Sequence, residues 1–584
     1  MVVDNSLSAK RPWWKEANVY QIYPASFKDS NGDGVGDIPG IISKLDYIKD
    51  LGVDIVWLCP CYKSPQVDMG YDISDYRDIY EKYGTLDDID DLIRGLHERG
   101  LKLVMDLVVN HTSDQIPDGR QHEWFKSAIS SKDSPYRDYY VWKKPKIGPN
   151  GERLPPNNWL SYFRGSVWEY DEASDEYYLH LFAKEQPDLN WENPKVQAEV
   201  HDVIRFWLDR GVDGFRLDAI NLISKDLDFP DAAVANPSAK YQDGAIYYTN
   251  GPRLHEHLRG MGKIFREYDA FSVGEMGGFT DPNEVIKVVA EEREELNMIF
   301  QFEIVDMDIS PVGRYFPRKW KLSELKRIVN KWETYMYEHH GWNALYLENH
   351  DQGRSVSRFA SDKPEFRAHA AKMLATFLGL QSGSVFVYEG QELGMANMPK
   401  SWGIDKLKDL ESINFYTELV ESGASEEVLQ VVLADLQKKC RDNARTPMQW
   451  DSTAFAGFST VQPWMDVMDD YKEWNAVSQV DDPSSVYSYW RSIFDLRRAH
   501  KDIFVYGSFN LVDAVDEQVL SYERRYEGKR VLVITSFSEL EALWTVPEEY
   551  VRSGKVLLSN YGDVENLKKD IALRPFEAIV YLLD

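Results

Sequence analysis

Residues 101–111 have the sequence LKLVMDLVVNH, an apolar run of strand length that ends in two polar residues. Before it, residues 86–99 show the apolar spacing of an amphipathic helix, and VDIVWL (53–58) is another strand candidate. After it, a helix is expected near 196–210 and a strand at VDGFRLD (212–218). Strands that alternate with helices in this way predict a parallel sheet covered by helices.

The alternation continues along most of the chain. A helix is expected near 39–51, and five more strand candidates are VYQIYP (19–24), FSVGE (271–275), NMIFQFEI (297–304), NALYLE (343–348) and SVFVYEG (384–390). The candidates then number eight, which is the count of a closed (β/α)₈ barrel. We therefore predict an α/β protein built on a TIM barrel.

Three stretches depart from this alternation. Residues 111–192 are rich in Pro, Gly, Trp and Tyr and lack a helical period, which predicts a subdomain inserted after the third strand. The stretch from about 391 to 480 is helical but irregular, and we expect it to elaborate the last strand–helix connection. Short alternating strands predict a C-terminal antiparallel β-sandwich over 512–584. The barrel would then comprise residues 1–110 and 193–511.

Composition and charge narrow the choice of partners. The 584 residues include 67 Lys and Arg against 96 Asp and Glu, for a net charge of −29. Such a charge repels nucleic acids and anionic membranes, so we expect a small neutral or cationic ligand. We expect a cytoplasmic protein without a membrane span, because we find neither a secretory signal nor an uninterrupted apolar run of membrane length. A monomer is expected, with a homo-oligomer as the alternative.

Acidic residues lie at the ends of several predicted strands. Asp218 ends the fourth strand, Glu275 ends the fifth, and Asp351 follows the seventh. Catalytic groups of a barrel lie at the C-terminal ends of its strands. A single acid there is usually a helix cap or an ion-pair partner, but three that converge repel one another, which favours a function.

Six short motifs resemble those of the α-amylase superfamily, glycoside hydrolase family 13. They are DLVVNH (106–111), QPDLN (186–190), GFRLD (214–218), VGE (273–275), ENHD (348–351) and ARTPMQW (444–450). DLVVNH, GFRLD, VGE and ENHD resemble the four signature regions and follow the family order. QPDLN resembles the fifth region in the form typical of the oligo-1,6-glucosidase and α-glucosidase branch, and ARTPMQW is another mark of that branch. The resemblance runs from about Trp13 to the C-terminus and is greatest to fungal maltases and isomaltases. It implies a retaining α-glucosidase.

The resemblance also implies catalytic roles. Asp218 matches the nucleophile that forms a covalent glucosyl-enzyme, Glu275 the general acid/base, and Asp351 the third carboxylate, which grips ring hydroxyls. Arg216 lies two residues before Asp218 on the same strand face, so its guanidinium can hold the nucleophile ionised. Asp106 is interpreted as support behind the site.

The same resemblance implies a closed glucose pocket. His111 and His350 match histidines that donate hydrogen bonds to glucose. Asp68 and Tyr71, in DMGYD (68–72), match residues that hold and stack the terminal glucose, and Arg445 matches a basic partner of Asp68. A closed pocket admits only the end of a chain, which predicts an exo-acting enzyme.

The first strand–helix connection carries a candidate cation loop, D-x-N-x-D-G-x-G-D. Its expected ligands are Asp29, Asn31, Asp33, the Val35 carbonyl and Asp37. This order matches a Ca²⁺ loop that lacks the usual Glu at position twelve, and relatives bind a divalent ion there. We expect a structural Ca²⁺, with Mg²⁺ or a plain polar Asx turn as the alternatives.

The linkage preference depends on two departures from the related enzymes. Ala219 follows the nucleophile, where relatives that cleave α-1,6 links commonly have Val and fungal maltases have Thr. Gly277 and Gly278 follow Glu275-Met276, where the yeast isomaltase pattern has a polar side chain at the first glycine. Both changes widen the space for the leaving sugar. We expect an α-1,4 preference on maltose-type substrates and some transglucosylation.

Other functions remain as alternatives. An isomaltase, a transglucosylase or a sucrose isomerase would use the same residues, and a phosphosugar hydrolase would need a basic cluster at the pocket. A non-catalytic homologue, such as a membrane-anchored transporter heavy chain, would have lost the catalytic acids, which this chain keeps.

Overall fold

Eight parallel strands form the central sheet of the computed structural model, which describes residues 11–115, 122–311, 313–551, 554–564 and 567–583. In sheet order they are β13 (Met298–Phe300), β12 (Phe271–Glu275), β11 (Gly214–Asp218), β5 (Lys102–Val108), β2 (Ile55–Leu58), β1 (Asn18–Ile22), β15 (Ser384–Tyr388) and β14 (Ala344–Leu345). A parallel bridge between Ile299 and Asn343 joins the two edges. The eight predicted strands and the barrel are confirmed.

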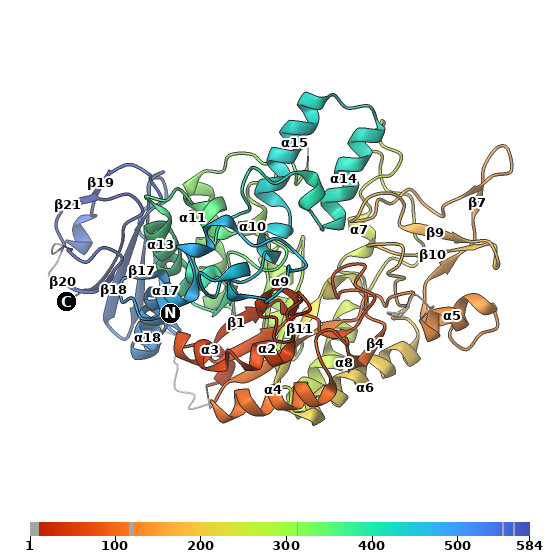
Figure 1. Cartoon of the computed structure of the whole chain (residues 1–584), viewed down its shortest axis with the longest axis horizontal. Coiled ribbons are helices and arrows are strands. Elements are labelled where there is room, and N and C mark those ends of the chain that lie inside the picture. The colour runs from red at the N-terminus through yellow and green to blue at the C-terminus, as the bar shows by residue number, and fades with distance from the viewer. Residues whose placement is uncertain (1–10, 116–121, 312, 552–553, 565–566, 584) are drawn as a thin grey trace.

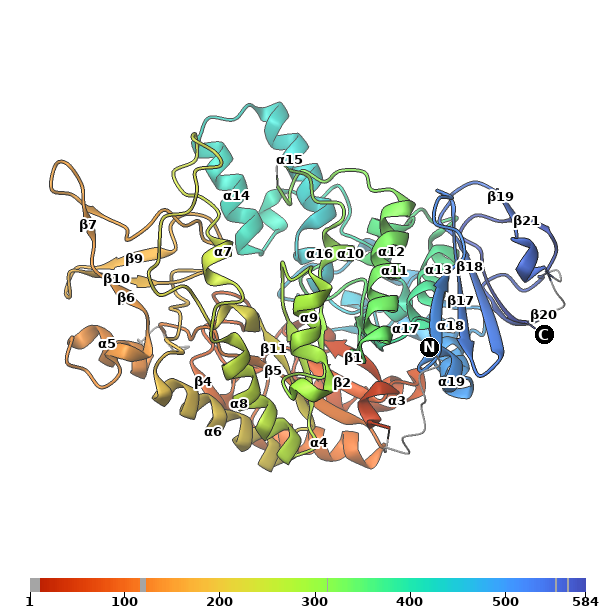
Figure 2. The same ribbon diagram turned by 180° about the vertical axis from the view of Figure 1, so that it is seen from behind.

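Helices cover the outside of the barrel (Figure 2). The main ones are α2 (Ile38–Ile42), α3 (Leu45–Leu51), α4 (Leu86–Glu98), α6 (Pro194–Arg210), α8 (Leu254–Glu267), α9 (Pro282–Val289), α11 (Leu322–Glu338), α13 (Arg367–Gly379) and α18 (Val486–Ala499). Shorter ones are α1 (Pro24–Phe27), α7 (Ala245–Tyr248), α10 (Glu303–Asp306), α12 (Ser355–Phe359) and α19 (Lys501–Phe504).

Local sequence sets where these helices begin and end. Thr85 and Asp88 form a capping box at the start of α4, whose apolar face is buried against the barrel. Asn193 caps α6 and Pro194 occupies its first position, while Gly211, at φ 108°, allows the left-handed turn that ends it.

A small hairpin of β3 (Tyr62–Lys63) and β4 (Asp75–Ile79) lies between β2 and α4, and a subdomain follows β5. It contains a sheet of β6 (Trp142–Lys143), β10 (Glu176–Leu179) and β9 (Trp168–Asp171), and a hairpin of β7 (Lys146–Ile147) and β8 (Arg153–Leu154). It also contains α5 (Glu123–Ser130), although the sequence indicated no helix here. This helix is too short for a clear period: it buries only Phe125 and Ala128 and relies on the cap of His122.

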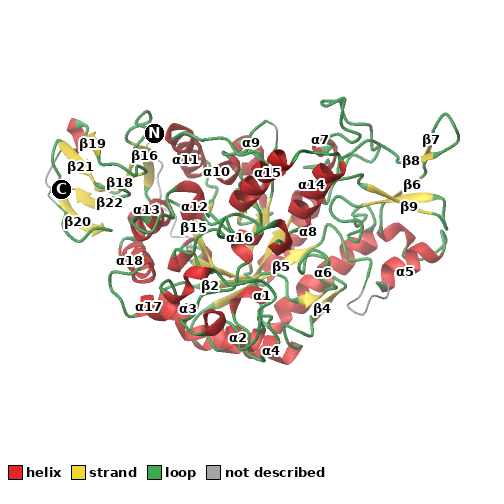
Figure 3. Ribbon diagram, turned by 45° about the horizontal axis from the view of Figure 1, so that its top comes forward, coloured by secondary structure: helices red, strands yellow, loops and turns green. Residues whose placement is uncertain are grey.

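After β15, helices α14 (Leu410–Glu421), α15 (Glu426–Lys439), α16 (Asp442–Arg445) and α17 (Ala476–Val480) elaborate the last connection. Figure 3 shows α14 and α15 beside the inserted subdomain.

The C-terminal part is a β-sandwich. One sheet contains β16 (Ser508–Leu511), β17 (Val519–Tyr526), β18 (Lys529–Ser536), β22 (Ala578–Leu583) and β20 (Gly554–Ser559), and the other contains β19 (Ala542–Thr545) and β21 (Asp570–Leu573). A separate core that includes Leu532, Trp544 and Tyr581 joins the sheets. The predicted boundary at 512 falls after β16, and the other domain boundaries stay predictions. Among the described residues, no helix is both long and apolar enough to cross a membrane.

Candidate active site

Adjacent barrel strands bring three of the predicted residues together. Arg216 and Asp218 lie two residues apart on β11, so both side chains project from the same face, and Glu275 ends the neighbouring strand β12. Nη1 of Arg216 donates to Oδ1 of Asp218 at 2.7 Å, and its Nη2 donates to Glu275. A single buried guanidinium therefore joins the two carboxyl groups.

Asp106 lies behind this pair, as the sequence predicted. Its Oδ1 accepts from Nη1 of Arg216 at 2.5 Å, and its Oδ2 accepts from the indole N–H of Trp57 at 3.0 Å. Asp106 is fully buried, and burial raises the pKa of its carboxyl group to about 6. It fixes the guanidinium from the side opposite the opening.

Burial also raises the pKa values of the two proposed catalytic carboxyl groups. The pKa of Glu275 rises to about 8 and that of Asp218 to about 7, although the Arg216 charge opposes both shifts. Since Glu275 has the higher pKa, the first proton lost from the pair leaves Asp218 ionised and Glu275 protonated.

The pKa of Asp351 is shifted in the opposite direction from those of Glu275 and Asp218. Burial opposes its ionisation, but His350, when its ring is protonated, and the permanently charged Arg441 and Arg445 hold the pKa of Asp351 well below its usual range. Nη2 of Arg445 lies 2.7 Å from Oδ1 of Asp351, and Nη1 of Arg441 lies 3.6 Å from the same atom. The site thus contains one permanently ionised carboxylate beside two that titrate.

His350 is held as a neutral ring. Its Nδ1 lies 2.8 Å from Nε2 of Gln21, and its ring stacks on that of Tyr71 with centroids 5.1 Å apart. Burial lowers the pKa of His350 to about 3. The Gln21 contact assigns the proton to Nε2, which forms no well-aligned hydrogen bond among the described residues but lies 3.3 Å from Oδ2 of Asp351. An N–H in this position is available for a sugar hydroxyl.

Asp68 forms an ion pair with Arg441, so the prediction that Arg445 is its partner is wrong. Nη2 of Arg441 lies 3.2 Å from Oδ1 of Asp68. Arg445 instead donates through Nε to the His350 carbonyl at 3.0 Å and through Nη2 to Asp351. The two arginines flank the single turn of α16, so both reach the pocket, and only the fold decides which carboxylate each one meets.

His111 and Tyr71 line the same pocket. Nε2 of His111 lies 2.9 Å from the Tyr71 carbonyl and 3.2 Å from Nε2 of Gln186, which also lies 3.3 Å from Oδ2 of Asp68. The structure therefore gathers all nine predicted catalytic and substrate residues at one mouth, while their roles stay predictions. Sequence reasoning missed Gln21 and Arg441 as pocket residues, and it used Gln186 only as a family mark.

A cavity of about 310 Å³ lies near the catalytic groups and is a candidate space for the leaving sugar. It is lined by Tyr162, Tyr248 and Phe415 and by Arg314, whose Nη2 donates to the Asp351 carbonyl at 2.8 Å. Ala219 packs against the aromatic cluster that includes Tyr248, and its φ of 41° is in the left-handed region. Ala219 is thus connected to this cavity through the cluster that contains Tyr248, although it is not itself a lining residue.

The predicted cation loop lies between β1 and α2, on the first connection of the barrel. Oδ1 of Asp29 accepts from the Asn31 and Gly32 N–H groups at 3.0 and 2.7 Å. The Asn31 side chain accepts from the Asp33 N–H, and the Asp33 side chain accepts from the Val35 N–H. These are consecutive Asx turns. Within the described ranges, no three His, Cys, Asp or Glu side chains gather into a metal cluster.

Comparisons with known proteins show which family this chain belongs to. The model of the α-amylase catalytic domain matches residues 21–507. An α-glucosidase of Schizosaccharomyces pombe is 51% identical over 586 residues and covers 100% of both chains, and an oligo-1,6-glucosidase of Parageobacillus thermoglucosidasius is 50% identical, with 98% of this chain and 99% of that one covered.

Solved structures are similar over nearly the whole chain. A trehalose-6-phosphate hydrolase of Bacillus licheniformis superposes with a TM-score of 0.89 at 44% identity, covering 98% of this chain and 100% of its own. An isomaltulose synthase of Protaminobacter rubrum has a TM-score of 0.92 at 40% identity, with 99% and 100% covered. This chain belongs to the α-amylase superfamily of glycoside hydrolases, family 13.

Proposed function

We propose that this enzyme is a retaining exo-α-glucosidase that releases glucose from the non-reducing end of short α-1,4-linked sugars. The observation that carries the proposal is the contact of one guanidinium, Arg216, with both Asp218 and Glu275. Two carboxyl groups that share one guanidinium fit the close spacing of a retaining pair, about 5–5.5 Å, better than the wider spacing of an inverting pair.

The proposed reaction has two steps. Glu275 gives its proton to the glycosidic oxygen while Asp218 attacks the anomeric carbon, so the leaving sugar departs with a new hydroxyl and glucose becomes an ester on Asp218. Glu275, now ionised, takes a proton from water, whose oxygen displaces Asp218 and restores both groups. The raised pKa of Glu275 suits it to hold the first proton near neutral pH.

Exo action is supported by the closed inner end of the pocket. Asp68 and Arg441 form an ion pair there, and Asp351 and Arg445 form another beside it. Asp68, Arg441 and Arg445 are nearly buried and Asp351 is partly exposed. We propose that the two ion pairs close the pocket beyond the terminal glucose. We propose that they bind its hydroxyls together with His111 and His350.

A phosphorylated substrate is less well supported. Arg164 and Arg314 line the cavity for the leaving sugar, where a phosphate would need them. Arg164 lies 2.7 Å from a carboxylate oxygen of Glu418, and Arg314 lies 3.3 Å from one of Glu411, so both already have anionic partners.

The cation loop is proposed to bind one structural Ca²⁺ away from the catalytic groups. The side-chain oxygens of Asn31, Asp33 and Asp37 accept at most one hydrogen bond each, so each keeps a lone pair for an ion. Both oxygens of Asp29 already accept two hydrogen bonds, so Asp29 would have to give up one of these donors to bind the ion. Action as a monomer in the cytoplasm stays a prediction.

The proposed function is tested by rates on maltose, isomaltose, sucrose, nigerose, trehalose and trehalose 6-phosphate, with glucose and oligosaccharide products measured separately. We expect the highest kcat/KM on maltose, with glucose as the main product. If sucrose gives more of an isomer than of free glucose, the enzyme is a sucrose isomerase instead. If it prefers trehalose 6-phosphate, it is a phosphosugar hydrolase.

A further inference from the structure

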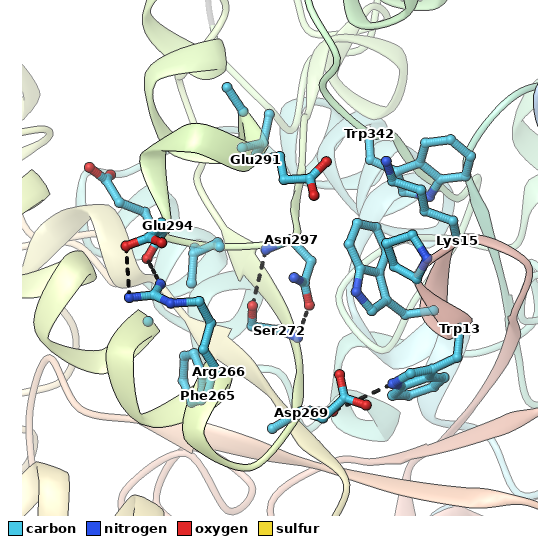
Figure 4. A pocket seen from close by; sticks show the side chains of 18 of the residues that line it. Trp13, Lys15, Phe265, Arg266, Asp269, Ser272, Glu291, Glu294, Asn297 and Trp342 are labelled. Carbon is cyan, nitrogen blue, oxygen red and sulfur yellow. Dashed lines mark hydrogen bonds and ion pairs between the residues drawn. The ribbon is translucent and has the colours of Figure 1, made fainter. Parts of the chain in front are cut away.

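A second cavity, of about 330 Å³, opens at the end of the barrel opposite the catalytic groups. It lies between the segment before β1, the N-terminal ends of β12 and β13, and helix α8; Trp13, Ser272 and Asn297 are among its lining residues (Figure 4). Its volume is within the roughly 300–1,000 Å³ range of small-molecule sites. The proposed reaction uses only the C-terminal ends of the strands and leaves this cavity unexplained.

One wall of this lower cavity is aromatic. Trp13, Trp14 and Trp342 line it, and the rings of Trp14 and Trp342 lie 6.3 Å apart at an angle of 77°. The ammonium group of Lys15 lies 5.4 Å from the Trp14 ring and 5.3 Å from the Trp342 ring. Broad indole faces beside a hydrogen-bond donor suit a ligand with both apolar and polar surfaces.

The other walls are polar. Arg266 and Glu294 form an ion pair at 3.1 Å across the cavity from the tryptophans, as Figure 4 shows. Ser272 and Asn297 lie between the two walls and bond each other, with the Ser272 N–H donating to the Asn297 side chain at 2.8 Å. These groups already have partners, so they line the cavity and need no charged ligand to balance them.

Three charged groups lining the cavity have no such partner. Within the described ranges, the side chains of Lys15, Asp269 and Glu291 form neither an ion pair within 4.0 Å nor a hydrogen bond, and burial lowers the pKa of Lys15. The charges nearly balance, with three basic and four acidic lining residues: Arg11, Lys15, Arg266, Asp269, Glu291, Glu294 and Glu295. A nearly balanced lining with one free donor, Lys15, and two free acceptors, Asp269 and Glu291, favours a neutral hydroxylated ligand over an ion.

We propose that the lower cavity is a second saccharide site, which binds one hexopyranose unit of a short neutral sugar. The C–H face of the ring packs on the tryptophans. Hydroxyl groups on the other edge accept from Lys15 and donate to Glu291, two groups that do not meet directly. This site is separate from the catalytic pocket, so its occupancy does not depend on catalysis.

The test counts maltose molecules bound by the full chain. The parent is an Asp218→Asn variant, which binds maltose but cannot form the glucosyl-enzyme, and isothermal titration calorimetry should give two sites per chain. Adding Lys15→Met and Glu291→Gln should leave one site. Adding Glu292→Gln, the matched control on an exposed neighbour that does not line the cavity, should leave two.

The outcomes separate this proposal from the proposed function. Maltose stoichiometry left unchanged by Lys15→Met and Glu291→Gln would overturn the second site. A parent with one site that this double change removes would support the second site and contradict maltose binding in the catalytic pocket. If the double change destabilises the chain, Glu291→Gln alone should lower the affinity of the second site for maltose at least tenfold. An unchanged affinity in that variant would also overturn the second site. In a chain that keeps Asp218, Lys15→Met and Glu291→Gln should leave kcat/KM on maltose within twofold of the wild-type value. Absence of glucose release would contradict only the catalytic proposal.

Discussion

Arg216 meets three carboxyl groups, and this one side chain determines much of the site's electrostatics. It is 1% exposed, so its charge is stabilised by Asp106, Asp218 and Glu275 rather than by water. Because the three acids share one cation, burial still raises the pKa of each. The arrangement supplies a protonated and an ionised group in one small volume.

The pH profile of the activity should be bell-shaped. Ionisation of Asp218 gives the rising limb and loss of the Glu275 proton gives the falling limb. Glu275→Gln should lower kcat on maltose about 10²–10⁴-fold and remove the falling limb, because Gln does not titrate. The measurement is kcat against pH for both proteins, and a falling limb retained in the variant would assign it to another group.

The same change should stabilise the folded chain at alkaline pH. Burial raises the pKa of folded Glu275 to about 8, whereas an exposed glutamate titrates near 4.3. The stability contribution of Glu275 is therefore fully present below about pH 4.3 and lost as the pH rises to about 8. The melting temperature of Glu275→Gln should exceed that of the wild type at pH 8 and equal it at pH 4. An equal difference at both values would contradict the pKa shift.

Arg441 is held by Asp409 as well as by Asp68. Its Nε lies 2.7 Å from Oδ1 of Asp409, which is fully buried. Asp409→Asn weakens that support without removing the guanidinium, so KM for maltose should rise at least about threefold with a smaller change in kcat, and Arg441→Met should lower kcat/KM at least about tenfold. A loss confined to kcat would indicate that the arginine does not act through binding.

Linkage preference can be tested at two neighbouring positions. Val at Ala219 adds contact beside the leaving sugar but must adopt a φ of 41°, a left-handed conformation that costs a residue roughly 1–2 kcal/mol. Ala219→Val should therefore raise the isomaltose-to-maltose ratio of kcat/KM while it lowers both activities.

Gly277 provides the less strained test. A Cβ there would meet only the Phe302 ring, at 3.7 Å, so the Cβ of Gly277→Gln fits without a clash. It should raise the isomaltose-to-maltose ratio with little loss of stability. A ratio that is unchanged in both variants, or a wild type that already prefers isomaltose, would disprove the proposed α-1,4 preference.

At the scale of elements, Ca²⁺ binding by the loop between β1 and α2 can be tested separately. One Ca²⁺ per chain should be found by elemental analysis, with oxygen distances of about 2.3–2.6 Å, whereas Mg²⁺ would lie near 2.1 Å. Chelation should lower the melting temperature and leave kcat/KM measured at 25 °C nearly unchanged. Chelation that alters neither stability nor metal content would leave the loop as a set of Asx turns.

The elements of the barrel could be predicted because each strand is a short apolar run followed by a polar end. The acids at the ends of β11 and β12 meet because parallel strands point the same way, which sequence order alone implies. Helix α5 could not be predicted, since it has only eight residues and two buried side chains. Arg441 was missed for a different reason: its contact with Asp68 joins positions 373 residues apart, and no local pattern encodes that pairing.

At the scale of the whole molecule, two additions to the barrel meet near the pocket. The inserted subdomain and the helical elaboration are joined by Arg164 and Glu418, 2.7 Å apart, and by the Asn414 side chain, which donates to the Phe163 carbonyl at 3.0 Å. The Phe163 ring also lies 5.1 Å from the Arg441 guanidinium. The pocket is thus closed by segments far apart in sequence, while the C-terminal sandwich lies at the other end of the molecule (Figure 1).

The central claim is that Asp218 attacks the anomeric carbon and that water then displaces it. Two displacements at one carbon restore the original configuration. Proton NMR of maltose hydrolysis, recorded before the released glucose can mutarotate, tests this most directly. We predict that the glucose from the non-reducing end first appears as the α-anomer. Initial release of the β-anomer would show a single displacement and contradict the account.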